Sequence, residues 1–164
     1  GGILVDFNAV KGGIEIIPLD NDWQKAAHVY SDEVLISHRT DAEKGTPKFE
    51  RGKSLSDHQR EMIYISGTAA IRGEESIVTG DVLVQTEITL ENIQHLIGLE
   101  EGREKLPEHS GKLELLRVYL KHEEDAKIVK EDMDKLCPDV PIVYLYADVC
   151  REELLVEIEG IAYL

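Results

Sequence analysis

The sequence predicts an α+β fold in which two helices pack on one face of a mixed β-sheet. Two segments, residues 82–97 and 126–136, carry apolar residues at the spacing of an amphipathic helix. Shorter segments before and after them alternate apolar and polar residues, as strands do. A sheet covered on one face by helices buries both kinds of apolar surface, so we expect the element order β-β-β-α-β-α-β-β.

Two short segments at the start of the chain have the composition of strands. Residues 3–10 and 14–19 are largely apolar, and the two glycines in residues 11–13 separate them. Because glycine adopts positive φ at little cost, we expect a hairpin between the two segments. Residues 20–60 are polar and are interrupted by glycine and proline, which predicts an irregular connection.

The composition fits one compact unit. The chain has 164 residues, of which 42% are hydrophobic, and this is enough to build a single core. Within this unit we expect residues 1–61 to form an N-terminal hairpin and irregular extension. Residues 62–164 are expected to form the main α+β domain.

The first helix has the clearest boundaries in the sequence. A strand-like segment at residues 61–71 precedes it, and a polar turn is expected at residues 72–75. Asp81 is a typical N-cap residue, and Gly98 directly follows the apolar stripe. These two residues predict a helix over residues 82–97.

The rest of the chain alternates strands with the second helix. Residues 113–121 alternate like a strand, and the residues that share one face are Leu116, Val118 and Leu120. The apolar stripe of the second helix consists of Ala126, Val129, Met133 and Leu136. Prolines follow this helix, and residues 142–148 and 154–162 are predicted to form the last two strands.

The charge of the chain argues against a nucleic-acid partner. It has 18 basic and 33 acidic residues, a formal net charge of -15, and no basic stripe interleaved with aromatic residues. No segment approaches the ~20 apolar residues that cross a bilayer. We therefore expect no nucleic acid and no membrane among its partners, and a cytoplasmic location.

The cysteines and histidines show no metal-binding pattern. Cys137 and Cys150 lack the paired spacing of a zinc site, and they do not form a disulfide framework, which is typical of a reducing compartment. The six histidines are scattered without ligand spacing. We expect neither a metal nor a cofactor.

The last predicted strand carries two carboxylates on one face. Because side chains alternate along a strand, one face has Leu154, Val156, Ile158 and Ala162. The other face has Leu155, Glu157, Glu159 and Ile161. From these residues alone, solvated glutamates or glutamates paired with arginine are the favoured interpretation, and an acid facing a cleft is the alternative.

Five short segments together form a recognisable pattern. They are residues 65–68 (ISGT), 79–81 (TGD) followed by Gln85, 90–93 (LENI), 117–120 (RVYL) and 156–162 (VEIEGIA). Their order and spacing resemble the RidA/YjgF superfamily, which also carries the labels endoribonuclease L-PSP and translation initiation inhibitor. The resemblance implies a chorismate-mutase-like fold and a homotrimer with ligand clefts between subunits.

A second set of segments includes the N-terminal part of the chain. It consists of residues 18–24 (PLDNDWQ), 49–52 (FERG), 66–73 (SGTAAIRG) and 147–151 (ADVCR). These segments resemble the C-terminal domain of FkbO-like chorismatases, which hydrolyse chorismate to pyruvate and a dihydroxy or hydroxybenzoate product. The resemblance implies an active-site cysteine, Cys150, seven residues before a catalytic glutamate, Glu157.

The same resemblance implies a site for a small anionic metabolite. Glu157 would be the general acid if burial raises its pKa, and Arg51 or Arg151 would bind a substrate carboxylate. The other substrate-binding candidates are Ser66, Gly67, Tyr144 and Glu159. The implied reaction adds water to an unsaturated carbon beside a carboxylate, in an enolpyruvyl ether or in an imine.

Two other functions stay open beside a chorismatase-like hydrolase. The substrate-binding arginine of active RidA deaminases corresponds to Ile142, and a cysteine near it corresponds to Tyr144, which argues against an ordinary enamine or imine deaminase. Glu74 and Glu75 stand where chorismatases are expected to have neutral residues, and the chain is about half their usual length. A non-catalytic ligand-binding or sensing module of the same fold is therefore the main alternative to an enzyme.

Overall fold

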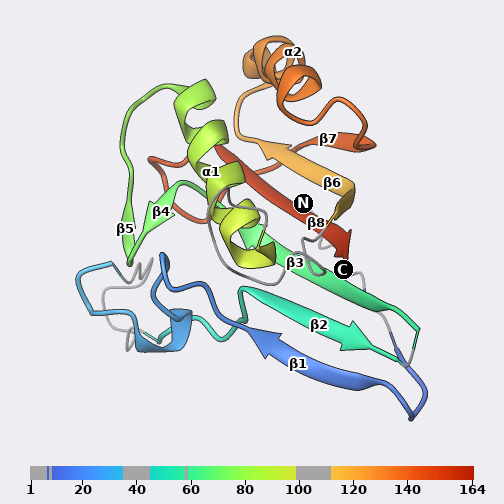
Figure 1. The fold of residues 1–164 in the computed structure, drawn as a ribbon. Coiled ribbons are helices and arrows are strands. Elements are labelled where there is room, and N and C mark those ends of the chain that lie inside the picture. Colours follow the sequence, from blue (N-terminus) through green and yellow to red (C-terminus); the bar gives the residue numbers. More distant parts are fainter. Residues whose placement is uncertain (1–6, 8, 35–44, 58, 99–111) are drawn as a thin grey trace.

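The fold is built on a six-stranded mixed sheet (Figure 1). The strand order is β1-β2-β3-β8-β6-β7, and neighbouring strands are antiparallel except for β6 and β7. The strands are β1 (Glu15–Leu19), β2 (Gly52–Ser56), β3 (Glu61–Thr68), β6 (Lys112–Leu120), β7 (Ile142–Tyr146) and β8 (Val156–Tyr163). A separate two-stranded sheet consists of β4 (Ile71–Arg72) and β5 (Glu75–Ser76). This computed structural model describes residues 7, 9–34, 45–57, 59–98 and 112–164.

Two helices pack on one face of the sheet, as predicted. Helix α1 (Val82–Ile97) contacts β3, β8 and helix α2 (Ala126–Leu136). The buried side chains of both helices join one core cluster with inward-facing residues of β3, β6 and β8. Two single-turn 3-10 helices, η1 (Ala27–Val29) and η2 (Glu123–Asp125), lie outside this core. The arrangement confirms the predicted α+β class.

The core follows the predicted alternation along the strands. The fully buried strand residues include Leu116, Val118, Leu120, Val156, Ile158 and Ala162. In α2, Val129 and Met133 are buried, but Leu136 is 44% exposed, so its predicted place in the buried stripe is wrong. The helix ends at Leu136, and the next residue, Cys137, is buried in the core instead.

Helix α1 begins and ends where the sequence predicts. The Asp81 carboxylate accepts hydrogen bonds from the N–H groups of Leu83 (2.9 Å) and Val84 (3.4 Å), which satisfies donors that have no partner within the helix. Gly98 follows with φ +77°, a left-handed conformation that glycine adopts most readily. Neither α1 nor any other helix in the described ranges is long and apolar enough to cross a membrane.

The predicted N-terminal hairpin stays a prediction, because its first strand lies largely outside the described residues. Strand β1 pairs with β2, with Glu15 opposite Ser56 and Leu19 opposite Gly52. The predicted partner, residues 3–10, lies largely outside the described residues, and positions 7, 9 and 10 are not in a strand. The glycine-rich turn marks where a strand can end, but strand pairing depends on contacts far apart in the sequence.

Strand β2 lies in the segment that was expected to be irregular. In the sequence Gly52 resembles a turn residue, yet it lies in strand β2, opposite Ile65 of β3. A Cβ at this position would lie 2.9 Å from the Tyr64 carbonyl oxygen and 3.2 Å from Cδ2 of Leu96. Here glycine permits close packing of the sheet against α1, which composition alone does not distinguish from a turn.

Several element boundaries also differ from the prediction. The strand expected over residues 61–71 ends at Thr68, and the expected turn becomes the β4–β5 hairpin, with Gly73 at φ +60°. The last two strands are shorter or later than expected, at Ile142–Tyr146 and Val156–Tyr163. Strands β1 and β2 belong to the same sheet as β3, and the division after residue 61 stays a prediction.

Candidate functional site

A pocket of about 510 Å³ brings distant parts of the chain together. This volume is typical of small-molecule sites. Its lining residues are Tyr30, Val34, Gly45, Pro47, Phe49, Arg51, Ser66, Gly67, Ala69, Ile71, Cys150, Arg151 and Glu157. Six of the eight predicted site residues are therefore in one pocket: Arg51, Ser66, Gly67, Cys150, Arg151 and Glu157.

Glu157 is the acidic group of this pocket. In β8, Val156 and Ile158 are buried under the helices, so Glu157 points to the other face. Its carboxyl group lies against Gly67, where an added Cβ would be 3.0 Å from Cδ of Glu157. Burial first, and then the charge of Glu159, raises the pKa of Glu157. The shift favours the protonated form that a general acid requires.

A β-bulge lies in β3 at residues 66–67, next to the pocket. In the pairing of β3 with β8, Ile65 lies opposite Gly160, whereas Thr68 lies opposite Ile158. Strand β3 thus has one extra residue between these two pairs. Such a bulge redirects the chain locally, and here the redirected residues line the pocket.

The backbone of Ser66 is already engaged within the protein. Its N–H donates to the Arg51 carbonyl oxygen (3.1 Å), and its carbonyl accepts from the Thr68 hydroxyl (2.8 Å). The Ser66 N–H therefore lies in a bond that holds the wall of the pocket. The close approach of Glu157 is the feature that requires glycine at residue 67.

Arg51 is buried at the pocket, with only 4% of its surface exposed. Its Nη2 donates to the Lys25 carbonyl (2.6 Å) and to the Tyr30 hydroxyl (2.5 Å). The centre of the Phe49 ring lies 5.0 Å from the guanidinium carbon. Its Nε is buried and has no hydrogen-bond partner within the described ranges. The guanidinium group is thus fixed in place at the pocket without using all of its donors.

Arg151 lies on the same pocket wall and is 8% exposed. Its Nη1 donates to the Glu74 carbonyl and to the Ser76 hydroxyl, both at 2.9 Å. The Tyr30 ring centre lies 5.6 Å from the guanidinium carbon of Arg151 and 5.8 Å from that of Arg51. Both distances are within the range of a cation–π contact, so Tyr30 stabilises the two cations together.

Neither arginine is neutralised by a direct ion pair in the part of the chain that the structure describes, although the charge of Arg151 contributes to lowering the pKa of Glu153. Neither Arg51 nor Arg151 forms an ion pair with a described carboxylate. Burying a charge without a counter-charge is costly. Glu157 is the one acid among the described lining residues, and burial raises its pKa. The pocket is therefore suited to an anionic ligand.

Cys150 and Glu157 line the same pocket, as the resemblance implied. Cys150 is a free, exposed cysteine. Although part of the residue is exposed, the protein atoms around the thiol keep water from it and raise its pKa; the charge of Glu157 acts in the same direction, and Arg151 in the opposite one. Cys150 is therefore protonated at neutral pH and is a weak nucleophile. Across the described residues, no group of three or more histidine, cysteine or acidic side chains could hold a metal ion.

Tyr144 lies on the other face of the sheet, away from the pocket. It is in register with Val118 in the parallel pair of β6 and β7, and it packs against the core under the helices. Burial first, and then Asp134 and Cys137, raises the pKa of its hydroxyl to about 12. The structure therefore does not bring this candidate to the pocket, and Ile142 packs against the same core.

Glu159 shares a face with Glu157 but is not among the lining residues. Its carboxylate forms an ion pair with Arg117 Nε (3.0 Å) and accepts a hydrogen bond from the Tyr119 hydroxyl. Burial, with a further contribution from Glu159, raises the pKa of Tyr119 to about 12. Pairing with arginine, one of the two interpretations of this strand, thus describes Glu159 but not Glu157.

Two aromatic lining residues were not among the predicted site residues. Tyr30 and Phe49 both contact the Arg51 guanidinium. Both lie in the segment that was expected to be irregular, where no periodicity indicates which side chains face a pocket. Aromatic residues in a polar segment that also contains an arginine are the signal that could have identified them.

Comparison with known proteins shows similarity to chorismatases. No family model matches the chain. A chorismatase from Streptomyces rapamycinicus is 32% identical over 169 residues, covering 98% of this chain and 47% of the relative. A 3-hydroxybenzoate synthase from Streptomyces hygroscopicus is 36% identical over 128 residues, covering 70% of this chain and 36% of the relative. The chain thus spans less than half the length of these relatives.

Solved structures show the same relationship. A chorismatase crystal structure has a TM-score of 0.73 and 28% identity, covering 90% of this chain and 43% of that one. A member of the YjgF/YER057c/UK114 family from Mycobacterium tuberculosis has a TM-score of 0.52 and 18% identity, with 71% and 86% covered. The second likeness concerns the fold alone. Together they confirm the fold that the sequence segments implied.

Proposed function

Because this chain belongs to the RidA/YjgF superfamily and has chorismatases among its relatives, we propose that it is a chorismatase-like hydrolase. Its substrate would be a small anionic compound with an enolpyruvyl ether. The observation that carries this proposal is the pair of buried arginines, Arg51 and Arg151, neither of which forms an ion pair with a described carboxylate. They line one pocket with Glu157, a carboxyl group whose pKa is raised.

In this proposal the arginines bind the carboxylates of the substrate. Both guanidinium groups line the pocket and are held in place by carbonyl and hydroxyl acceptors. A fixed guanidinium binds a carboxylate without further ordering of its own side chain. The apolar lining residues Phe49, Ala69 and Ile71 would contact the ring of the substrate.

Glu157 would supply the proton that starts the reaction. The protonated carboxyl group gives its proton to the methylene carbon of the enol ether, which leaves an oxocarbenium ion. Water adds to this cation and returns a proton to the Glu157 carboxylate. The resulting hemiketal breaks its bond to the ring oxygen, which takes up the hydroxyl proton, so that pyruvate and an alcohol leave.

The test is pyruvate release from chorismate, followed with lactate dehydrogenase and NADH. Wild-type protein should release pyruvate, and Glu157→Gln should abolish release because the amide cannot protonate carbon. Glu114→Gln, which alters an exposed strand glutamate outside the lining, should retain full activity. Full activity in Glu157→Gln would contradict the assignment of the acid.

The relative named 3-hydroxybenzoate synthase suggests the product class. We propose that Cys150, as a neutral thiol in the same pocket, directs the reaction toward 3-hydroxybenzoate, which forms when the ring alcohol left after pyruvate release loses its second hydroxyl group and a ring proton as water. Chromatography of the aromatic product would test this step. Unchanged products from Cys150→Ala would remove Cys150 from the mechanism while leaving Glu157 in it.

A non-catalytic ligand-binding module is the second candidate. Glu74 and Glu75, which stand where chorismatases are expected to have neutral residues, favour this candidate. Saturable binding of chorismate by calorimetry, with no pyruvate released, would support this candidate. Deaminase activity is the least favoured function, because the residues that correspond to the deaminase arginine and cysteine, Ile142 and Tyr144, pack against the core. Turnover of 2-iminopropionate would support it.

We also propose that the protein assembles as a homotrimer. The sheet face opposite the helices carries half-buried apolar residues, including Leu115, Leu145 and Ile161, which a second copy could cover. Light scattering at the concentration of the activity assay would measure the molar mass. A monomer would contradict the trimer without affecting the assignment of the pocket.

A further inference from the structure

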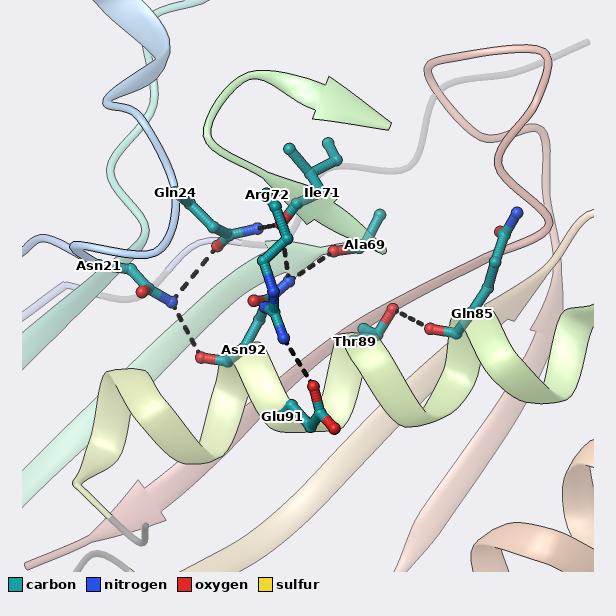
Figure 2. Close-up of polar contacts among 9 residues, drawn as sticks. All are labelled: Asn21, Gln24, Ala69, Ile71, Arg72, Gln85, Thr89, Glu91 and Asn92. Atoms are coloured by element: carbon teal, nitrogen blue, oxygen red, sulfur yellow. Dashed lines mark hydrogen bonds and ion pairs between the residues drawn. The ribbon is translucent and has the colours of Figure 1, made fainter. Parts of the chain in front are cut away.

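The buried side of α1 carries a stripe of polar side chains. Gln85, Thr89 and Asn92 follow one another at intervals of four and three residues, so they share one face of the helix (Figure 2). Each is 0% exposed. Apolar residues usually occupy such positions because a buried polar group must find hydrogen-bond partners. The partners of Asn92 line the pocket, and those of Gln85 lie in the loop between two lining residues, Arg151 and Glu157.

Asn92 holds the wall that follows β3. Its Nδ2 donates to the carbonyl oxygens of Ala69 (3.0 Å) and Ile71 (3.1 Å), and Figure 2 shows the amide pointing toward both. Ala69 and Ile71 line the pocket. The Asn92 carbonyl also accepts from Asn21 Nδ2 (2.9 Å), which ties the N-terminal segment to the same turn of the helix.

Gln85 holds the segment that joins the two charged groups of the pocket. Its Nε2 donates to the Glu153 carbonyl (2.9 Å), and its Oε1 accepts from the Leu155 N–H (2.8 Å). Both ends of the amide are therefore used on one short loop. This loop lies between Arg151 and Glu157 in the sequence, so the amide bridges the connection from the cation to the acid.

We propose that Gln85 and Asn92 are positioning residues for the pocket, an inference that rests on the proposed function. Gln85 sets the separation of Arg151 from Glu157, and Asn92 sets the apolar wall. A substrate carboxylate and the carbon that receives the proton have a fixed separation, so the cation and the acid must match it. The apolar wall held by Asn92 contacts the substrate ring, so it affects substrate binding more than proton transfer.

These roles predict different kinetic effects on chorismate hydrolysis. Gln85→Met, which keeps length but removes both hydrogen bonds, should lower kcat by about 10- to 100-fold with little change in KM, because small misplacement of reacting groups costs rate. Asn92→Leu should mainly raise KM. Thr86→Val is the matched control, since Thr86 is equally buried on α1 but bonds only to Val82 of its own helix.

Hydrogen exchange of the same full-length variants gives a structural measurement beside the kinetics. Hydrogen exchange at the Leu155 amide should accelerate in Gln85→Met and stay slow in Thr86→Val. If Gln85→Met does not fold, Gln85→Glu serves instead. That variant keeps the acceptor for Leu155 but loses the donor to Glu153, and it should also lower kcat.

The outcomes separate this inference from the proposed function. Two results overturn the positioning roles alone. In the first, the wild-type protein is active and the folded Gln85 variant has an unchanged kcat. In the second, all three substitutions change kcat and KM equally. If calorimetry shows that wild-type protein binds chorismate but does not turn it over, the proposed hydrolase activity is wrong. In that case, weaker chorismate binding by the variants, together with faster hydrogen exchange at the Leu155 amide in Gln85→Met, supports the positioning roles. Absence of both turnover and binding overturns both proposals.

Discussion

The carboxyl group of Glu157 occupies the space that a side chain at residue 67 would fill. A Cβ on Gly67 would lie 3.0 Å from Cδ of Glu157 and closer still to Oε1. Gly67 does not have positive φ, so the obstacle to a side chain there is space and not backbone strain. The displaced group would be the end of a flexible side chain, and that group is the proposed acid.

Gly67→Ala should therefore impair catalysis more than folding. We expect chorismate hydrolysis to fall by about 10- to 100-fold because the acid moves away from the substrate. The free energy of unfolding should change by about 1 kcal/mol or less, since alanine also restricts the unfolded chain. Pyruvate release and urea unfolding measure the two effects. Gly12→Ala, where an added Cβ meets no atom within 4 Å, is the control, and unimpaired hydrolysis in Gly67→Ala would refute the relationship.

Arg51→Met should remove stabilisation by anions. Wild-type protein should melt at a higher temperature when 3-hydroxybenzoate is added, because a ligand that binds only the folded state stabilises it. The variant lacks the buried cation, so its melting temperature should not respond. Differential scanning fluorimetry with and without the ligand measures the shift, and the exposed Arg60→Met should behave like wild type. An equal shift in Arg51→Met would exclude Arg51 from the anion site.

Glu159→Gln should shift the pH profile of hydrolysis. The proposed acid works when protonated, so the rate should fall as the pH rises through the raised pKa of Glu157. Removing the charge of Glu159 lowers that pKa, and the alkaline limb should move to lower pH. Burial is the larger cause of the shift, so part of the elevation should remain. The control is the exposed Glu152→Gln, and a limb that stays in place or moves to higher pH would rule out this coupling.

Glu74→Gln should weaken the docking of the N-terminal segment. The Ser31 N–H, followed by Lys25, lowers the pKa of Glu74 from 4.5 to about 2. A lowered pKa stabilises the folded state above about pH 4.5, and this contribution is lost as the pH falls toward 2. Urea unfolding should show a less stable variant at pH 7 and a difference that shrinks in acid. Glu75→Gln, its exposed neighbour, is the control, and a deficit independent of pH would argue against the ionic cause.

The sequence alone determined the features that depend on local periodicity. Helix α1 begins after Asp81 and ends before Gly98 as predicted, because capping and the apolar stripe act within a few turns. The alternation in the last strand placed Glu157 on the face opposite Val156 and Ile158. The family segments identified six residues that now line one pocket.

The tertiary structure decided which segments are neighbours. It paired β1 with β2, put Tyr144 under the helices, and engaged Glu159 with Arg117. It also placed Tyr30 beside both arginines. Periodicity specifies the faces of a single strand, but the register and order of strands follow from the packing of the whole core. Two glutamates on the same strand face can therefore differ, one beside a pocket and the other in an ion pair.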